Sequence, residues 1–261
     1  MVLDAASALI LGIVEGFTEF LPISSTAHLN LASDLMGFAQ SEYVKTFEIA
    51  IQSGAILAVV VLYWKKFLDW EIVKRVAVAF VPTAILGAIF YKLIKSFLIG
   101  NTVVALLALA LGGLFLIVFE KLHKNPADER VRGLADSTMS YKQSFLVGLF
   151  QSVAMIPGVS RAAATIVGGM LLGVRRAAIV EFSFLLAVPT MLAATGYDLI
   201  KSAGMFSLSE VNILAVGFIA SFVMAVVSIK FLLSYIRRHS FTAFGVYRIL
   251  LVLVFIPAYF I

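Results

Sequence analysis

A cluster of charged and polar side chains lies between residues 9 and 31, in a stretch that is otherwise apolar enough to enter a membrane. An ionised group in hydrocarbon is costly unless it is paired or hydrated, so charged residues within membrane segments usually mark a functional site. We therefore expect the chemistry of this protein to involve this cluster. Its charged and polar members are Glu15, Glu19, Ser24, Ser25, Thr26 and His28, and the helix-breaking Pro22 lies among them.

The order of these residues predicts a helix that is broken within the membrane. Glu15 and Glu19 are four residues apart and share one face of a helix. Pro22 cannot continue that helix, because it lacks an N–H and clashes with the preceding turn. Ser24 is suited to cap a second half-helix, for which Gly37 is a suitable end.

This arrangement is suited to binding a phosphate together with a metal ion. Ser25, Thr26 and His28 fall in the first turn of the second half-helix, where free N–H groups and the helix dipole attract anions. Glu15 and Glu19 would repel an anion unless a cation lay between them. A divalent hard cation, Mg2+ or Ca2+, held by both carboxylates and shared with phosphate oxygens would resolve that conflict.

A second break follows the same plan without the acids. Pro157 and Gly158 predict a turn, Ser160 a helix cap, and Arg161 a guanidinium at another half-helix N-terminus. A guanidinium binds phosphate through two parallel hydrogen bonds, which lysine cannot do. We expect Arg161 to lie across the bound phosphate from the first cluster.

The composition indicates a polytopic membrane protein. Of 261 residues, 62% are hydrophobic and 13% are charged, with no cysteine. Soluble domains have about 25% charged residues. The excess of basic residues suits cytoplasmic loops, so no nucleic-acid partner is expected. Apolar runs long enough to span a bilayer occur at 47–64, 76–95, 103–121, 179–200, 211–235 and 243–261.

Loop charges favour re-entrant paths for the two remaining segments, 5–36 and 142–173. If each enters and leaves on one side, most basic loop residues fall on one face, and the positive-inside rule makes that face cytoplasmic. Both termini and the opening of the first break are then extracytoplasmic. The basic face would hold Lys65, Lys66, Lys74, Arg75, Lys121, Lys124, Arg130, Arg132, Lys142, Arg175, Arg176, Arg237 and Arg238, against Lys45, Lys92, Lys95 and Lys201 opposite.

An internal repeat supports this topology. Residues 12–25 align with 148–161 with one gap, at an offset of about 135 residues. Three spans separate the two segments, so the second would enter from the opposite face. We therefore predict one all-α membrane domain over 1–261, with six transmembrane helices and two re-entrant helix pairs related by an inverted-topology repeat. Repeat one covers about 5–121 and repeat two about 142–261. Arg248, within the last span, is interpreted as pairing with a lipid headgroup or an acidic partner.

Two long motifs resemble the undecaprenyl-diphosphate phosphatases of the bacitracin-resistance type. The first is Glu15-Gly-x-x-Glu19-Phe-Leu-Pro22-x-Ser24-Ser25-Thr26-x-His28, and the second is Pro157-Gly158-x-Ser160-Arg161. The resemblance covers nearly the whole chain. It implies an enzyme of the plasma membrane that removes the terminal phosphate of undecaprenyl diphosphate at the extracytoplasmic side. It also implies a divalent cation and regeneration of the monophosphate carrier for cell-envelope synthesis.

The resemblance implies a role for each motif residue. The carboxylate pair would bind the metal, with one member also catalytic, and the histidine and arginine would be catalytic. The catalytic residues are Glu19, Ser25, His28 and Arg161, the substrate-binding residues Ser24, Thr26, Gly158, Ser160 and Arg161, and the metal ligands Glu15 and Glu19. The second motif departs from the family at Ala162 and Ala163, where Ser-Gly is usual, so position 162 receives no role.

The expected reaction is hydrolysis of a phosphoanhydride, with the isoprenoid tail in an apolar groove reached from the bilayer. Either Ser25 or a water is the nucleophile. His28, tuned by Glu19, is expected to act as general base and then as general acid. Membrane lipids are further partners, and the oligomeric state stays open, a homodimer included.

Two other functions remain. The inverted repeat also suits a flippase or transporter of polyprenyl phosphate. Alternatively, the carboxylates could couple protons or sodium ions to transport of a soluble anion, although no amphipathic span suggests a broad aqueous path.

Overall fold

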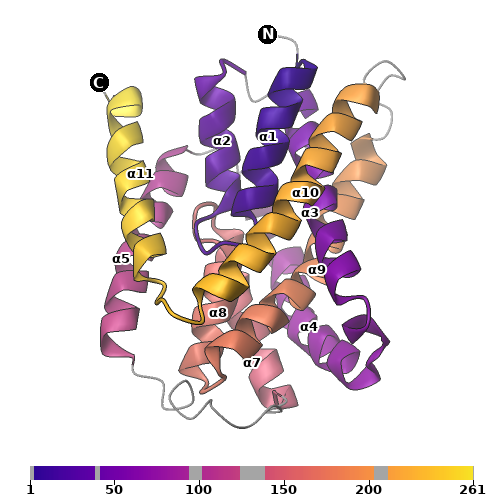
Figure 1. The fold of residues 1–261 in the computed structure, drawn as a ribbon, viewed down its shortest axis with the longest axis vertical. Coiled ribbons are helices and arrows are strands. Elements are labelled where there is room, and N and C mark those ends of the chain that lie inside the picture. Colours follow the sequence, from indigo (N-terminus) through magenta and orange to yellow (C-terminus); the bar gives the residue numbers. More distant parts are fainter. Residues whose placement is uncertain (1–2, 39–41, 94–101, 124–138, 203–210, 261) are drawn as a thin grey trace.

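The computed structural model describes residues 3–38, 42–93, 102–123, 139–202 and 211–260, whose regular structure is entirely helical (Figure 1). The first half contains α1 (Ala5–Thr18), α2 (Ser25–Leu35), α3 (Glu42–Tyr63), η1 (Lys66–Leu68), α4 (Trp70–Leu93) and α5 (Thr102–Leu122). The second half contains α7 (Tyr141–Ser152), η3 (Val153–Met155), α8 (Arg161–Leu171), α9 (Arg176–Ser202), α10 (Val211–Tyr235) and α11 (Thr242–Phe260).

Five of the described helices are long and apolar enough to span a bilayer. The sixth predicted span, 243–261, corresponds to α11, whose apolar stretch within the described residues, Thr242–Ile256, is shorter. The five candidate spans are Tyr43–Tyr63, Trp70–Phe90, Thr102–Leu122, Arg176–Gly196 and Val211–Tyr235.

Three of these helices, α3, α4 and α9, begin earlier than the apolar pattern predicts. In α4 and α9, the fold accommodates a charged residue near the start of the helix. The side chain of Arg75 in α4 donates a hydrogen bond to the carbonyl of Met139 at 2.6 Å. Arg176 at the start of α9 forms an ion pair with Glu120 at 2.8 Å. A charge that is paired inside the protein does not end a helix, although it ends an apolar run in the sequence.

The short helices form two pairs that meet in the middle of the molecule. α1 and α2 lie side by side in the upper half of Figure 1, and α7 and α8 lie in the lower half. The loops that join each pair approach one another at mid-height. The start of α1 and the end of α11 lie at the same upper edge.

Caps define where these short helices begin. The Asp4 carboxylate accepts a hydrogen bond from the Ser7 N–H at 2.8 Å, which lowers the pKa of the Asp4 carboxyl. Ser140 forms a reciprocal capping box with Gln143 at the start of α7. Gly37 adopts a φ of 72° just after the end of α2, as predicted for a helix stop.

Each pair packs against a long helix of the other half. α1 lies along α10, and α7 lies along α4. Gly12 and Gly148, which the internal repeat aligns, make these contacts close. A Cβ at Gly12 would collide with the carbonyl of Gly217, and one at Gly148 with that of Ala79. The same small residue therefore serves the same helix contact in both halves.

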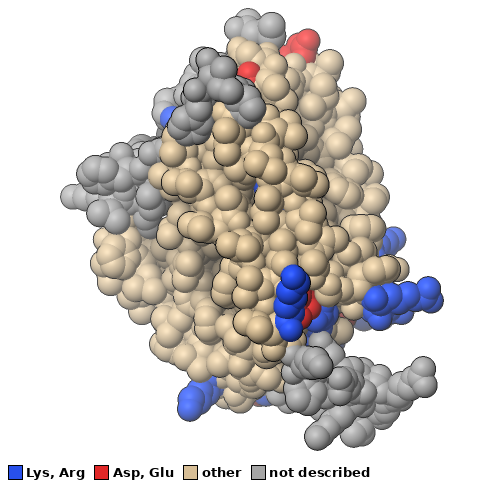
Figure 2. Space-filling view, turned by 90° about the vertical axis from the view of Figure 1, so that its left-hand side faces the viewer, with Lys and Arg blue, Asp and Glu red and all other residues tan. Residues whose placement is uncertain are grey.

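The surface of the helical bundle is mainly apolar. Figure 2 shows one face covered almost entirely by uncharged residues, with most of its basic side chains toward the lower end. Exposed leucine, valine and phenylalanine side chains line α5 and α11, as expected for helices in contact with lipid. The exposed basic residues include Lys65, Lys66, Lys142, Arg237 and Arg238.

Candidate active site

The first break places an irregular turn between two half-helices. α1 ends at Thr18, and Glu19 still donates its backbone N–H to the carbonyl of Glu15 at 2.9 Å. The chain then turns at Pro22 and reaches Ser24, whose φ is 71°. Ser24 directly precedes α2, as predicted, but its side chain makes no capping hydrogen bond.

The second break repeats this backbone path. Ser160 has a φ of 76° and directly precedes α8. Here the predicted cap is present, since the Ser160 hydroxyl accepts a hydrogen bond from the Ala163 N–H at 3.2 Å. Gly158 has a φ of 93°, and a Cβ at this position would collide with the carbonyl of Ala105. Gly158 is therefore required for the close approach of the break to α5.

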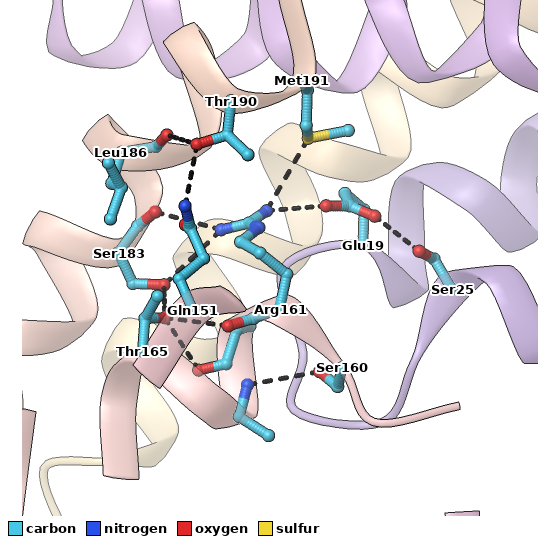
Figure 3. Close-up of polar contacts among 12 residues, drawn as sticks. Glu19, Ser25, Gln151, Ser160, Arg161, Thr165, Ser183, Leu186, Thr190 and Met191 are labelled. Carbon is cyan, nitrogen blue, oxygen red and sulfur yellow. Dashed lines mark hydrogen bonds and ion pairs between the residues drawn. The ribbon is translucent and has the colours of Figure 1, made fainter. Parts of the chain in front are cut away.

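Glu19 joins the two breaks and the candidate nucleophile (Figure 3). One carboxylate oxygen lies 2.6 Å from Nη2 of Arg161. The other accepts a hydrogen bond from the Ser25 hydroxyl at 2.5 Å. The side chains of Glu19 and Arg161 are 9% and 12% exposed, so water screens this ion pair only weakly. The structure thus brings together three of the four predicted catalytic residues.

Further contacts on α9 orient the guanidinium of Arg161. Its Nη1 donates to the carbonyl of Ser183 at 3.0 Å, and Nη2 lies 3.8 Å from the sulfur of Met191. The group also lies over the ring of Phe20, 5.7 Å from its centroid. Its Nε is buried and has no partner within the described residues. One N–H of this guanidinium is therefore unsatisfied in the substrate-free protein.

His28 turns away from this centre toward α11. Its Nδ1 donates to the carbonyl of Ser24 at 2.7 Å, since a carbonyl oxygen can only accept. The hydroxyl of Tyr247 lies 2.8 Å from Nε2, and the two rings stack within 9° of parallel. No hydrogen bond joins His28 to Ser25 or Glu19 in the described part of the chain. The structure therefore does not show the predicted tuning of His28 by Glu19.

Glu15 is the side chain best suited to hold a metal ion. It is fully buried, and neither carboxylate oxygen has a partner among the described residues. It interacts electrostatically with Glu19 and with Glu48, which accepts a hydrogen bond from Ser33 at 2.7 Å. Within the described residues there is no cluster of three side chains spaced to bind a metal. The donor set therefore suits a cation held by two carboxylates and completed by phosphate oxygens and water.

The remaining predicted residues differ in their surroundings. Thr26 is exposed at the start of α2, where its hydroxyl can reach a ligand. The position equivalent to Glu15 in the second half, Gln151, is enclosed. Its amide donates to the hydroxyls of Thr83 and Thr190 at 2.9 and 3.0 Å, while its own oxygen is buried and unpartnered in the described residues.

Sequence reasoning missed the contribution of α11. Tyr247 gives no signal in an apolar helix, because tyrosine is common there. Arg248 does give a signal, being a charge inside a span, but the pairing predicted for it is wrong. Instead of a lipid headgroup or an acidic partner, it binds backbone carbonyls of both breaks. Ser183 likewise contributes its backbone, which leaves no trace in a pattern of side chains.

Comparisons with known proteins give a consistent result. A family model described as bacitracin resistance protein BacA matches residues 8–254. The undecaprenyl-diphosphatase of Aquifex aeolicus is 52% identical over 250 residues, which cover 95% of this chain and 96% of that protein. The protein of that name from Sulfurihydrogenibium sp. is 53% identical over 94% of this chain and 95% of its own length. The one from Wolinella succinogenes is 47% identical over 97% and 98%.

Proposed function

Because the chain belongs to the family of the bacitracin resistance protein BacA, we propose that it hydrolyses undecaprenyl diphosphate to the monophosphate and inorganic phosphate. The observation that carries this proposal is the carboxylate of Glu19, which contacts both Ser25 and Arg161. A hydroxyl bonded to a carboxylate, beside a fixed guanidinium, is suited to attack a phosphoryl group. Hydrolysis supplies the lipid carrier for cell-envelope synthesis and confers bacitracin resistance.

In the first step, Ser25 attacks the terminal phosphorus and its proton passes to Glu19. The bond from oxygen of Ser25 to phosphorus forms, and the anhydride bond breaks to release the lipid monophosphate. Arg161 and the N-terminus of α2 stabilise the charge on the transferring phosphoryl group. The geometry favours Ser25 over water as nucleophile, because its hydroxyl already contacts a base at 2.5 Å.

In the second step, a water attacks the phosphoserine, so that a bond from the water oxygen to phosphorus forms and the bond from the Ser25 oxygen to phosphorus breaks. Glu19 returns its proton to Ser25, one proton of the water passes to His28, and inorganic phosphate leaves. His28 is the second proton carrier, with its Nε2 lone pair facing the hydroxyl of Tyr247. Glu15 and Glu19 would hold a divalent cation, Mg2+ or Ca2+, which supplies positive charge to the phosphate oxygens when bound. Thr26, Ser24 and Ser160 would contribute further polar contacts to the substrate.

The proposal extends to the topology. Six transmembrane helices and two re-entrant pairs would form an inverted repeat, an arrangement that the packing of α1 on α10 and of α7 on α4 supports. The loop charges support a plasma-membrane orientation with the active site and both termini extracytoplasmic. Because the chain has no cysteine, single cysteines at Leu35 and at Lys66 can test this. The cysteine at position 35 should react with an impermeant thiol reagent added outside cells, and the cysteine at position 66 should not.

Phosphate release by the purified protein from undecaprenyl diphosphate tests the activity. We expect release to stop with a chelator and to return with Mg2+ or Ca2+. Ser25→Ala should lower kcat by at least about a thousandfold, while the exposed Ser234→Ala should not change it. After acid quench, peptide mass spectrometry should find phosphate on Ser25. Parent activity in Ser25→Ala would contradict the nucleophile, and no release by the parent protein would contradict the function.

The packing of α1 on α10 and of α7 on α4 also favours a second candidate function, movement of polyprenyl phosphate across the bilayer. Inverted repeats are common in proteins that expose one site alternately to each side. Phosphate release in detergent, where no two sides exist, measures hydrolysis alone. Transfer of a labelled lipid phosphate between leaflets of vesicles measures transport. A protein that transfers lipid without releasing phosphate would be a flippase.

A further inference from the structure

Arg248 is the largest fully buried side chain of the described residues, with an exposed fraction of 0%. It lies in α11, directly after Tyr247. A buried charge is costly unless its hydrogen-bonding groups are satisfied, and an arginine in such a place normally has a carboxylate partner. Within the described part of the chain, the acceptors of Arg248 are all backbone carbonyls, which calls for an explanation.

The guanidinium has as many carbonyl acceptors as it has N–H groups. An arginine carries five such donors. Nε donates to Leu109, and Nη2 donates to Ala108 and to Gly158. Nη1 donates to Val159 and, at the long distance of 3.4 Å, to Pro22. The other four distances are 3.2 Å for Leu109, 3.1 Å for Ala108, 3.1 Å for Val159 and 2.7 Å for Gly158. No donor is left over for a ligand, so this arginine is not an anion site.

These acceptors come from three separate segments. Pro22 lies at the turn of the first break, three residues from both Glu19 and Ser25. Val159 and its preceding glycine form the turn of the second break, two to three residues before Arg161. The other two carbonyls belong to α5. One side chain thus connects both turns to the same helix.

The surroundings are built to hold the guanidinium in this position. Gly112 of α5 leaves room for it, since a Cβ there would collide with Nη2. An apolar cavity of about 210 Å³ adjoins it, lined by residues that include Phe115, Leu116 and Val167. These apolar side chains offer no donor to the carbonyls of the second break. Without Arg248, those carbonyls would be left unsatisfied or would have to move.

We propose that Arg248 is a positioning residue, which fixes the two breaks relative to each other and so sets the separation of Ser25 from Arg161. It touches neither the substrate nor the reacting atoms. The inference rests on the proposed function only in treating Ser25 and Arg161 as the reacting pair. Its structural content, a fixed distance between two half-helix turns, can be measured without any activity.

Arg248→Lys is the first test, because lysine keeps the charge but offers at most three donors. A displacement of about 1 Å at a catalytic site can cost about a hundredfold in rate. We therefore expect kcat to fall by between about tenfold and a hundredfold, while KM for undecaprenyl diphosphate changes little. Arg176→Lys is the matched control, since Arg176 is also largely buried but pairs with Glu120, away from both breaks.

A distance measurement separates positioning from general instability. Two cysteines at the exposed Leu35 and Leu171, near the ends of α2 and α8, can carry spin labels in this cysteine-free chain. Pulsed electron resonance should show a shifted or broader distance distribution in Arg248→Lys than in the parent. The Arg176→Lys protein should keep the parent distribution.

Gly112→Ala is the second variant, for the case in which Arg248→Lys fails to fold. Alanine favours the helix, but its methyl group displaces the guanidinium without removing it, so kcat should again fall. Gly196→Ala is the control, because a Cβ there meets no other atom. Parent-like kcat, or a lower kcat with an unchanged distance distribution, would overturn the proposal. A parent protein without phosphatase activity would refute the proposed function but leave the distance test valid.

Discussion

The two breaks use the same backbone device but carry different side chains. In each, a serine with positive φ directly precedes a half-helix, at 71° for Ser24 and 76° for Ser160. Such a conformation costs about 1–3 kcal/mol for a residue other than glycine. Two equal deviations at aligned positions indicate that the path of the turn itself is required. It presents the first N–H groups of α2 and α8 near the middle of the molecule.

The side chains around this shared frame divide the chemistry. The first break supplies carboxylates, a hydroxyl and an imidazole, whereas the second supplies one guanidinium. At the aligned positions Glu15 and Gln151, the first side chain has no partner in the described residues and the second donates to two threonines. A duplicated backbone thus provides two anion-attracting helix ends. Changes of single side chains make one end a base and the other a fixed positive charge.

Removing the guanidinium of the second break should have the largest effect. Arg161→Lys keeps the charge but loses the planar fork that contacts Glu19 and Ser183. We expect kcat/KM to fall by about a thousandfold, as for other arginines that stabilise a transferring phosphoryl group. Phosphate release at varied substrate concentration measures this. Arg237→Lys, an exposed arginine, is the control, and more than a tenth of parent activity in Arg161→Lys would show that charge alone suffices.

The next largest effect is expected from exchanging the aligned residues Glu15 and Gln151, which tests whether the first break alone binds the cation. Glu15→Gln removes one of the two carboxylates that would hold the cation. We expect the Mg2+ concentration that gives half-maximal activity to rise at least about tenfold, as when other metal sites lose a supporting residue. A metal titration of phosphate release measures this shift. An unchanged titration curve would remove Glu15 from the metal site.

The reverse exchange, Gln151→Glu, should affect stability instead. A carboxylate cannot donate to Thr83 and Thr190, so one buried and one half-buried hydroxyl lose their donor. The expected cost is about 1–3 kcal/mol, seen as a lower melting temperature in detergent with the same metal requirement. A new metal dependence in this variant would mean that the two halves are chemically equivalent.

Tyr247→Phe should have a smaller effect, confined to the first break. The loss of one neutral hydrogen bond to His28 costs about 1 kcal/mol, or roughly fivefold in kcat. The pH profile of kcat should also move, because the tyrosine hydroxyl no longer holds Nε2 of His28. Tyr141→Phe, at a half-exposed tyrosine bonded to Glu71, is the control. Identical pH profiles for Tyr247→Phe and the parent would exclude this role.

The smallest expected effect is a difference in stability between the Ser24→Ala and Ser160→Ala variants, which change the serine that precedes each half-helix. Ser160→Ala removes a capping hydrogen bond and should lower stability by about 1 kcal/mol. Ser24→Ala removes no such bond and should change the melting temperature less. Thermal unfolding of both variants in the same detergent checks the order. Equal losses would mean that the hydroxyl of Ser24 makes an equally stabilising contact in the substrate-free protein.

The positions of both breaks could be predicted because Pro22 and Pro157 interrupt apolar segments and are followed by serines. The approach of Arg161 to the first cluster followed from charge balance around a phosphate. The orientation of His28 could not be predicted, since it depends on a rotamer and on Tyr247, 219 residues away. The early start of α9 was missed because hydropathy counts a charge as polar, even when it is paired with Glu120.

The partners of Arg248 also lie beyond sequence reasoning. Its acceptors are backbone carbonyls, which every residue has, so no pattern distinguishes the ones that it binds. Only the unusual placement of a charge in a span was visible. Gly112 could have been a hint, but a glycine in a membrane helix serves close helix packing at least as often as it makes room for a side chain.

The contact between Glu19 and Arg161 has a consequence for turnover. In the substrate-free protein, the guanidinium that must bind phosphate is already occupied by an anion of the same chain. An incoming phosphate therefore competes with a resident carboxylate, and the carboxylate reclaims the arginine when phosphate leaves. We expect inorganic phosphate to inhibit the enzyme only weakly. In a direct titration without divalent cation, it should bind more tightly to the inactive Glu19→Gln variant than to the parent. Equal affinity in both proteins would show that this competition is absent.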